Sequence, residues 1–326
     1  MSESHPEPTN KPELTAEEIL SRVLYRDGLM LVIDKPAGLP VHRGPKGGAN
    51  LESSFDFLRY GLPRPPVLAH RLDRDTSGCL VLGRHRKATA SLGLLFKHGR
   101  ISKTYWAVVE GGPVEDEGTI ELPIGRLNAE RGWWQKIDPQ GQPATTRWRV
   151  LGRSFGGGDS SASDAARGTA ARDTSPHGAS AAAASSPPPC GEGSGVGVHN
   201  GSLASDRSPN GEGAGSGGGD SASTALGDPH PRPLPARGRG EGLTWLALQP
   251  VTGRTHQLRV HSAAMGWPIV GDNIYGTGPR FGEPTLHLHA REIVVPISRN
   301  KPPIVVTAPA PPHLHERLRA CGWNGE

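Results

Sequence analysis

HRLDRDTSG, residues 70–78, runs directly into the short apolar stretch CLVL, residues 79–82. The first stretch sets the carboxylate of Asp73 among basic and hydroxyl side chains just before a glycine turn, and the second is typical of a buried strand. Asp73 is therefore expected in a cleft at the lip of a sheet, where a chain can present a carboxylate nucleophile. The alternative is a charged surface turn without a function, because most such charges are only solvated.

Hydrophobic spacing on either side of this turn predicts an alternation of strands and helices. The expected helices lie over residues 16–23, 51–58, 88–96 and 255–265, and the expected strands over residues 29–33, 79–82, 105–109 and 120–122. For the last helix we expect Thr255 as the N-cap and Gly266 as the end. These elements predict an α+β fold, with a mixed, mostly antiparallel sheet flanked by helices.

Glycine and proline are concentrated in one tract. The chain has 326 residues, 45 of them Gly and 32 Pro, and residues 153–242 hold almost no large apolar side chain. Such a tract does not bury enough surface to offset the entropy lost on ordering, so we expect a disordered, low-complexity insertion. It separates residues 146–151 from residues 243–248, and the strand-like alternation of both stretches predicts that they pair as a hairpin.

This insertion defines the expected domain organisation. Residues 24–152 and 243–326 are expected to form one catalytic domain, with residues 1–23 as an N-terminal extension and residues 153–242 as the insertion. Without the insertion, the chain has a size that a single hydrophobic core supports.

Charge and cysteine content bear on partners and compartment. A formal net charge of +4 suits a polyanionic partner, and basic residues cluster between Arg84 and Lys103. The three cysteines, Cys79, Cys190 and Cys321, form no Cys-x-x-Cys pair, which favours a reducing compartment. No stretch approaches the length of a membrane span. We expect a monomeric cytoplasmic protein that does not associate with membranes.

The HRLDRDTSG stretch resembles the signature of the RluA-type pseudouridine synthases, which act on transfer RNA and large-subunit ribosomal RNA. Four further blocks resemble the same family and stand in its order. They are LVIDKPAGLPVH at residues 31–42, KTYWAVVEG at residues 103–111, GRTHQLRVHSAAMGWPIVGDNIYG at residues 253–276 and LHLHA at residues 286–290. The resemblance covers roughly residues 24–152 and 243–312 and implies the family's fold.

The same resemblance implies an RNA pseudouridine synthase that uses neither a cofactor nor a metal. By the family's pattern, Asp73 is the catalytic nucleophile and Arg259 is the cation that pairs with it, with Arg254 as a weaker candidate for that pairing. Tyr105 matches the aromatic residue that stacks on the target base and whose hydroxyl helps to remove the proton from carbon 5.

Substrate-binding residues follow from the same pattern. Arg71 is expected to fill the gap that a flipped uridine leaves in the RNA stack, and Leu258 to pack against the uracil ring. The remaining candidates for substrate contact are His70, Thr76 and Lys103.

The reaction breaks the bond from N1 of uracil to the ribose, turns the base and joins carbon 5 to the same ribose carbon. A carboxylate can divide this change into easier steps by adding to the sugar or to the pyrimidine, and the sequence leaves both routes open.

Three alternatives compete with this interpretation. A catalytically silent RNA-binding protein with the same fold has no need of the intact Asp73, Tyr105 and Arg259. A hydrolase using Asp73 and Asp75 lacks a placed second carboxylate. A zinc site built from His256, His261, His287 and His289 lacks accompanying cysteine or carboxylate ligands.

The expected substrate is a stem-loop. No separate RNA-binding domain of the kind found in several relatives precedes Leu24, so the catalytic core is expected to find its RNA alone. Bases in loops cost less to flip out than bases in a duplex. We therefore expect a stem-loop of transfer RNA, of 23S ribosomal RNA, or of both.

Overall fold

The computed structural model describes residues 13–44, 48–128, 134–154, 242–279, 282–298 and 300–325. These residues belong to one compact unit of the chain. The predicted disordered insertion lies outside the described residues except at its two ends, and the predicted N-terminal extension is described only from Glu13 onward.

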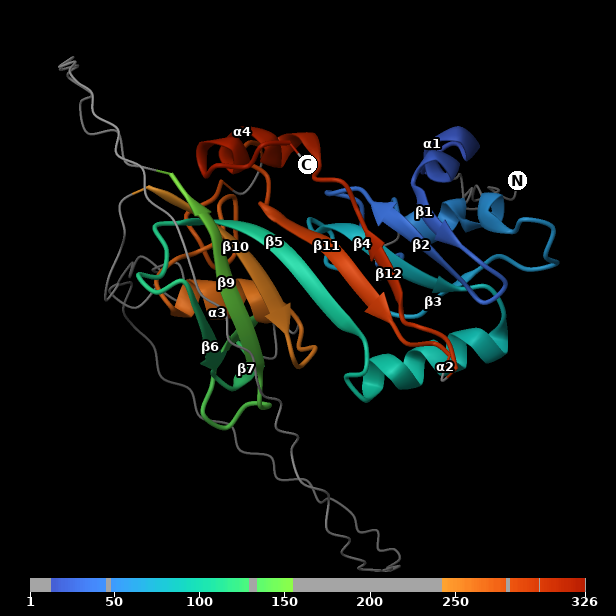
Figure 1. The fold of residues 1–326 in the computed structure, drawn as a ribbon, viewed down its shortest axis with the longest axis horizontal. Helices are drawn as coiled ribbons and strands as arrows, with labels where there is room; N and C mark the ends of the chain where they lie inside the picture. Colours follow the sequence, from blue (N-terminus) through green and yellow to red (C-terminus); the bar gives the residue numbers. More distant parts are fainter. Residues whose placement is uncertain are drawn as a thin grey trace, which may run out of the picture. The chain divides into compact units, whose positions relative to one another are not determined.

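A ten-stranded sheet forms the centre of the described unit (Figure 1). Its strands run in the order β1-β2-β4-β11-β5-β10-β9-β6, with β3 paired to β4 and β12 paired to β11. The bounds are β1 Val23–Arg26, β2 Met30–Lys35, β3 Val67–Leu68, β4 Ser77–Gly83, β5 Ser102–Glu110, β6 Glu117–Glu121, β9 Thr145–Arg153, β10 Leu243–Pro250, β11 Leu288–Val295 and β12 Ile304–Thr307. Strands β4 and β11 run parallel, whereas the other pairs are antiparallel. The predicted α+β fold with a mixed, mostly antiparallel sheet is confirmed.

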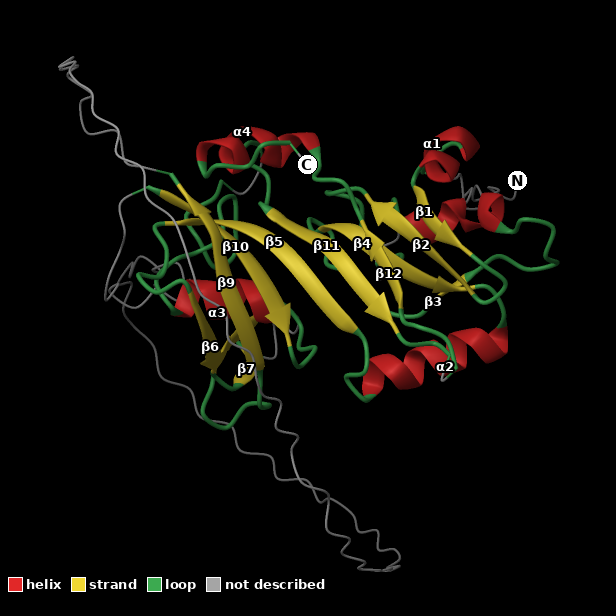
Figure 2. Ribbon diagram, in the orientation of Figure 1, coloured by secondary structure: helices red, strands yellow, loops and turns green. Residues whose placement is uncertain are grey.

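Helices cover both faces of this sheet (Figure 2). They are α1 Ala16–Ser21, the 3-10 helix η1 Leu51–Leu58, α2 Arg86–Lys97, α3 Gln257–Ala264 and α4 Pro312–Ala320. Successive strand residues point to opposite faces. Leu31 of β2 packs with α1, η1 and α3, whereas its neighbour Met30 packs with α2, and Trp245 of β10 packs with α4. Thus α1, η1 and α3 cover one face, and α2 and α4 cover the other.

The predicted pairing of residues 146–151 with residues 243–248 is confirmed as the antiparallel pair β9 and β10. Three helix predictions need correction. The helix expected over residues 16–23 ends at Ser21, and Val23 begins β1. Residues 51–58 are helical, but the helix is a 3-10 helix. Helix α3 begins at Gln257, and Thr255 is not its N-cap. His256 takes that position with a φ of 53°, a left-handed conformation from which a right-handed helix does not propagate backwards.

Strand β4 explains why the apolar run after Asp73 shows no alternation. All seven of its residues are buried, because β2 and β11 flank it and helices cover both faces of the sheet. Its second residue, Gly78, has a φ of 101°, and a Cβ placed there would collide with the carbonyl of Ala290 in β11. Only glycine allows the two strands to approach this closely. The glycine of the HRLDRDTSG stretch is therefore required by the packing of the sheet directly behind Asp73.

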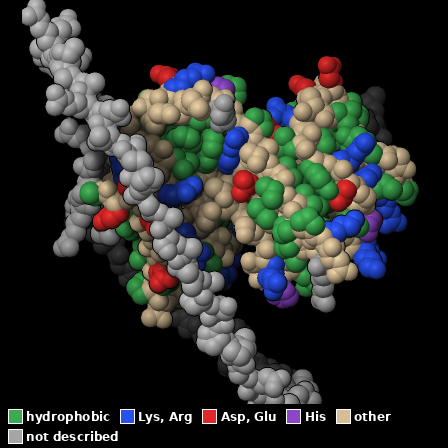
Figure 3. All heavy atoms as spheres, in the orientation of Figure 1, with side chains coloured by type: hydrophobic (Ala, Val, Ile, Leu, Met, Phe, Trp, Pro, Cys, Tyr) green, Lys and Arg blue, Asp and Glu red, His purple; other side chains and the backbone are tan. Residues whose placement is uncertain are grey.

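Basic side chains gather over α2 on the face drawn in Figure 3, in agreement with the cluster seen in the sequence between Arg84 and Lys103. In the part of the chain that the structure describes, no helix is long and apolar enough to cross a membrane. Nor do the described histidines, cysteines and carboxylates form a group of three or more that could hold a metal ion.

Buried histidines are expected to make the fold sensitive to acid. In His289, Nδ1 lies 2.9 Å from Oγ of Ser77, and Nε2 lies 3.3 Å from the carbonyl oxygen of Ala308. Burial lowers the pKa of His289 to about 4. Because the unfolded histidine binds a proton near pH 6.5 and the folded one does not, stability falls as the pH drops below 6.5. The expected loss at pH 5 is about 2 kcal/mol from this residue. Urea unfolding at pH 7, 6 and 5 measures this slope.

The matched variants for this measurement are His289→Asn and His98→Asn, the second at an exposed position. Asparagine keeps a hydrogen-bond acceptor for the hydroxyl of Ser77 but does not bind or release a proton between pH 5 and pH 7. We expect a shallower dependence of stability on pH in His289→Asn and an unchanged one in His98→Asn. An unchanged slope in both variants would contradict the prediction.

Candidate active site

A cavity of about 310 Å³ opens on the face of the sheet that α3 covers, and all nine residues predicted for the site line it. They are His70, Arg71, Asp73, Thr76, Lys103, Tyr105, Arg254, Leu258 and Arg259. These residues come from the loop before β4, from β5, and from the loop and first turn of α3. The fold therefore brings together three of the sequence blocks that are far apart in the chain.

A buried lysine holds the turn that carries Asp73. The amide of Thr76 donates to the carbonyl of Asp73 at 3.2 Å and closes the turn. Lys35, at the end of β2, donates from Nζ to the carbonyls of Arg74 at 2.8 Å and Thr76 at 2.9 Å, and also to the carbonyl of Pro36 at 2.7 Å. Its burial lowers the pKa of Lys35 to about 7, an effect that neighbouring carboxylates oppose. This lysine lies in the LVIDKPAGLPVH block, but its contact with the catalytic turn was not predicted.

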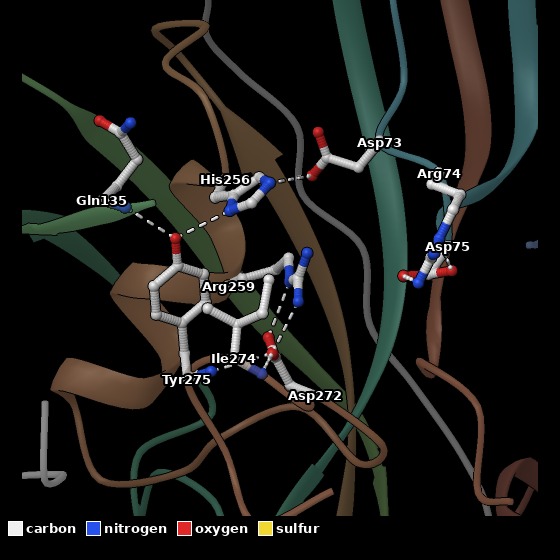
Figure 4. Close-up of polar contacts among 9 residues, drawn as sticks. All are labelled: Asp73, Arg74, Asp75, Gln135, His256, Arg259, Asp272, Ile274 and Tyr275. Carbon is white, nitrogen blue, oxygen red and sulfur yellow. Dashed lines mark hydrogen bonds and ion pairs between the residues drawn. The ribbon is translucent and has the colours of Figure 1, made fainter. Parts of the chain in front are cut away.

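Asp73 points into the cavity, and its side chain is 22% exposed. The next acidic residue, Asp75, is engaged elsewhere, because Arg74 donates to its two carboxylate oxygens at 2.9 and 3.2 Å (Figure 4). Asp75 does not line the cavity. The turn thus presents one carboxylate, that of Asp73, to the cavity.

The predicted ion pair between Arg259 and Asp73 is not formed in the described residues. Arg259 instead donates to both oxygens of the buried Asp272, at 2.8 Å from Nε and 2.7 Å from Nη2. The amides of Ile274 and Tyr275 donate to the same carboxylate at 2.9 and 3.0 Å. Burial alone would raise the pKa of Asp272, but Arg259 and these amides hold it below its usual value.

This geometry has a physical reason. A buried carboxylate needs a cation and hydrogen-bond donors, and Asp272 obtains both from groups within three residues of itself and from α3. Arg259 still acts on Asp73 at longer range. Burial alone would lower the pKa of Arg259, but the charges of Asp272 and Asp73 raise it above its usual value.

His256 is the side chain that approaches Asp73 in place of Arg259. Its Nε2 lies 3.8 Å from Oδ2 of Asp73, and its Nδ1 lies 2.7 Å from the hydroxyl of Tyr275 (Figure 4). That hydroxyl accepts a hydrogen bond from the amide of Gln135 at 2.9 Å. In the tautomer in which Tyr275 donates its own proton to Nδ1, Nε2 is the protonated nitrogen and faces Asp73. Burial is the main cause that lowers the pKa of His256, and Asp73 works in the opposite direction.

The left-handed backbone of His256 is held by the side chain of Gln257. Its Oε1 accepts from the hydroxyl of Thr252 at 2.7 Å and from the amide of Arg254 at 3.0 Å, while its Nε2 donates to the carbonyl of Thr145 at 2.9 Å. These bonds fasten the loop before α3 to β9. Arg254, the weaker predicted partner of Asp73, donates from Nε to the carbonyl of Pro143 at 3.1 Å.

The apolar wall of the cavity includes Tyr105 and Leu258, both buried. Burial, and secondarily the charge of Asp73, raises the pKa of Tyr105. Lys103 lies two residues earlier on the same strand, and burial lowers its pKa. The phenol of Tyr105 is therefore expected to stay protonated beside the carboxylate of Asp73.

His70 has a structural contact as well as a place in the cavity wall. Its Nε2 accepts from the amide of Val81 at 3.0 Å, and its ring stacks on Phe96 of α2 with 4.3 Å between the ring centres. Burial, together with the nearby Lys103, lowers the pKa of His70 to about 3. The neutral ring thus anchors the Asp73 loop to β4, a role that was not predicted.

Comparisons with known proteins agree with this geometry. The family model described as RNA pseudouridylate synthase matches residues 29–264. An uncharacterized RNA pseudouridine synthase of Zymomonas mobilis is 31% identical over 90% of this chain and 95% of the relative. Ribosomal large subunit pseudouridine synthase C of Vibrio cholerae is 26% identical over 98% of this chain and 75% of the relative. The solved structure of human RNA pseudouridylate synthase domain containing 1 is similar with a TM-score of 0.54, at 23% identity, over 94% of this chain and 86% of that one.

Proposed function

Since the chain belongs to the RNA pseudouridylate synthase family and is an RNA pseudouridine synthase, we propose that Asp73 is the nucleophile with which it isomerises uridine. The observation that carries this proposal is the position of Asp73. It is the carboxylate that lines a cavity otherwise walled by the aromatic, aliphatic and cationic side chains predicted for the site. The loop that bears it is fixed by the buried Lys35 on one side and by His70 on the other. A nucleophile needs such a fixed approach to its target atom.

The steps balance without an external reductant or metal. The carboxylate of Asp73 adds to the sugar or to the uracil ring, and the bond between N1 and the ribose breaks. The detached base turns so that carbon 5 bonds to the same ribose carbon and Asp73 is released. Carbon 5 then loses its proton, and N1, freed from the ribose, takes one up. In this scheme Tyr105 and Leu258 bracket the uracil ring and exclude water. Because the phenol of Tyr105 is protonated, it assists by accepting the carbon-5 proton as it passes its own to the released carboxylate.

His256 is proposed as a positioning residue for Asp73. In the neutral form assigned above, its Nε2 proton faces the carboxylate, and this contact can tighten when substrate fills the cavity. Tyr275 and the amide of Gln135 fix the ring by holding Nδ1 as an acceptor. The charge of Arg259, oriented by Asp272, adds a longer-range attraction for the same carboxylate.

Replacing Tyr275 with phenylalanine tests this arrangement. We expect kcat to fall by about 3- to 10-fold, the effect of one lost hydrogen bond on the barrier, with KM unchanged. Without the hydroxyl as donor, Nδ1 can bind a proton, so the acidic limb of the kcat profile should move to higher pH. The control is Tyr25→Phe, which loses an equivalent bond to Asp27 outside the cavity. A rise in KM with constant kcat, or an unmoved acidic limb, would contradict the role of His256.

The proposed substrate is a stem-loop of transfer RNA, of 23S ribosomal RNA, or of both. The name of the Vibrio cholerae relative refers to the large ribosomal subunit, which supports the ribosomal target. Arg71 is exposed at the cavity, where it can enter the RNA stack in place of the flipped uridine. A loop substrate also suits a reaction that needs a flipped-out base.

The proposed enzyme acts as a monomer in a reducing cytoplasm. All nine predicted site residues come from a single chain, so a second copy is not needed to complete the cavity. The free cysteines Cys79 and Cys321 are buried, which suits a reducing compartment.

Pseudouridine mapping of all cellular RNA tests the reaction and its target together. A strain without the gene is compared with strains restored by the wild type or by Asp73→Asn. Sites that disappear on deletion, return with the wild type and stay absent with the variant identify the substrate. Isolated stem-loops containing those sites should then be modified in vitro. Sites restored equally by both genes would overturn the assignment of Asp73, and inert stem-loops would overturn the substrate.

A further inference from the structure

A second cavity adjoins the one that holds Asp73. It measures about 520 Å³, and the two cavities share Arg71, Gly253, Arg254 and Thr255 in their walls. Its remaining walls come from the antiparallel pair β7 Ile124–Arg126 and β8 Gln135–Ile137 and from the turn that follows β8. None of the sequence motifs pointed to this pair of strands.

The lining of this cavity is cationic. Arg71, Arg126 and Arg254 line it, and no aspartate or glutamate among the described residues does so. Within the described ranges, the guanidinium groups of Arg71 and Arg126 form no hydrogen bond or ion pair. Asp138, an acidic residue of the adjoining turn, is paired with Lys136 at 3.6 Å. Such a lining is complementary to an anion, and guanidinium groups match the geometry of phosphate.

At two glycines, the wall of this second cavity consists of backbone without a side chain. A Cβ at Gly141 would lie 2.5 Å from the backbone of Ile124, and one at Gly125 would lie 2.7 Å from the side chain of Asp138. The strands and the turn therefore pack too closely here for any side chain. Reciprocal bonds between the amides and carbonyls of Ile124 and Gln142, at 2.9 and 2.8 Å, keep this wall fixed. A preformed polar wall lets a ligand bind with little ordering cost.

We propose that this cavity, called here the arginine cavity, binds the ribose and phosphate of the nucleotide next to the target uridine. The inference rests on the proposed function, because a base flipped into the Asp73 cavity leaves its neighbouring phosphodiester at the shared wall of Arg71 and Arg254. Arg126 then holds that phosphodiester from the far side. The side-chain amides of Gln140 and Gln142 line the same cavity and offer donors and acceptors to the ribose hydroxyl.

Fluorescence anisotropy with fluorescein-labelled decauridylate tests the arginine cavity in the intact chain. The variants are Arg126→Gln and, as the matched control, Arg149→Gln. Arg149 is exposed on β9, where its neighbour Trp148 faces the core that contains α3, so Arg149 points to the opposite face. We expect Arg126→Gln to raise Kd by about 3- to 10-fold. The slope of log Kd against the logarithm of the salt concentration should become shallower by the amount that corresponds to about one phosphate contact. Arg149→Gln should change neither quantity.

Turnover provides the second readout. Wild type and variants are assayed for tritium release from bulk RNA labelled with [5-³H]uridine in a strain without the gene. We expect Arg126→Gln to raise KM with kcat unchanged, because the arginine does not reach the reacting atoms. Equal weakening by both substitutions, or a fall in kcat at constant KM, would overturn the arginine cavity as a binding site.

These outcomes separate the inference from the proposed function. If the wild type releases tritium but Arg126→Gln binds decauridylate as tightly as the wild type, the arginine cavity fails and the function stands. If Arg126→Gln weakens binding selectively but the wild type releases no tritium, the arginine cavity stands and the function fails.

Discussion

Replacing Asp73 with asparagine is expected to lower the rate of tritium release from [5-³H]uridine-labelled RNA by at least about 1,000-fold, the scale on which loss of a nucleophile acts. Asparagine has nearly the same shape but is a far weaker nucleophile than a carboxylate. Because the side chain of Asp73 is partly exposed and its backbone is held independently by Lys35, the fold and the binding of RNA should be retained. Single-turnover assays with excess protein measure the rate.

The control is Asp75→Asn, the same chemical change two residues away, at a carboxylate that pairs with Arg74 outside the cavity. Its rate should stay within about threefold of the wild type, since Asp75 does not line the cavity. A rate for Asp73→Asn close to that of the wild type would remove Asp73 from the chemistry. A wild type that binds RNA but releases no tritium would favour the alternative of a catalytically silent RNA-binding protein.

Replacing Arg259 with methionine is expected to lower the free energy of unfolding by about 3–5 kcal/mol, because Asp272 is left buried without its cation. Turnover should fall as well, since the positive charge near Asp73 is lost. The pKa of Asp272 is lowered in the folded state, so its contribution to stability is present above the pKa of the unfolded carboxyl and is lost as the pH falls through the folded value. Urea unfolding and tritium release measure the two effects.

A double variant, Arg259→Met with Asp272→Leu, separates stability from catalysis. Apolar residues that replace both partners of a buried ion pair commonly restore stability. We therefore expect the double variant to regain most of the lost free energy of unfolding while its turnover stays low. Recovery of turnover along with stability would show that Arg259 acts only through the fold.

The residues predicted for the site do line one cavity, but the contacts among them were predicted less well. Asp73 could be predicted because a turn before a buried strand is a local pattern, and Gly78 marks that turn. The pairing of β9 with β10 followed from alternation in both stretches. Arg259 lines the same cavity as Asp73, as expected. Its partner Asp272 lies in a turn whose two amides face the carboxylate, and neither spacing nor composition predicts such a turn.

The approach of His256 to Asp73 was not predicted, for a similar reason. The expected helix began at Thr255, which would have placed His256 inside the first turn, whereas Gln257 holds it in a left-handed conformation that turns it towards Asp73. The same limit applies to Lys35 and to the arginine cavity. Both depend on contacts between segments far apart in the chain, such as Lys35 with the carbonyls of residues 74 and 76.

The junction between β9 and β10 divides the residues proposed for catalysis between two parts of the polypeptide. Ser154 and Leu243 close the strand pair from both sides, with the amide of each donating to an oxygen of the other at 2.8 and 2.7 Å. Asp73 and Tyr105 precede this junction in the chain, whereas His256 and Arg259 follow it. Two fragments that end at Ser154 and begin at Gly242 would each carry half of the cavity. Turnover would then report on the reassembly of the two fragments, so the chain can be divided at this strand pair to build a split-enzyme reporter.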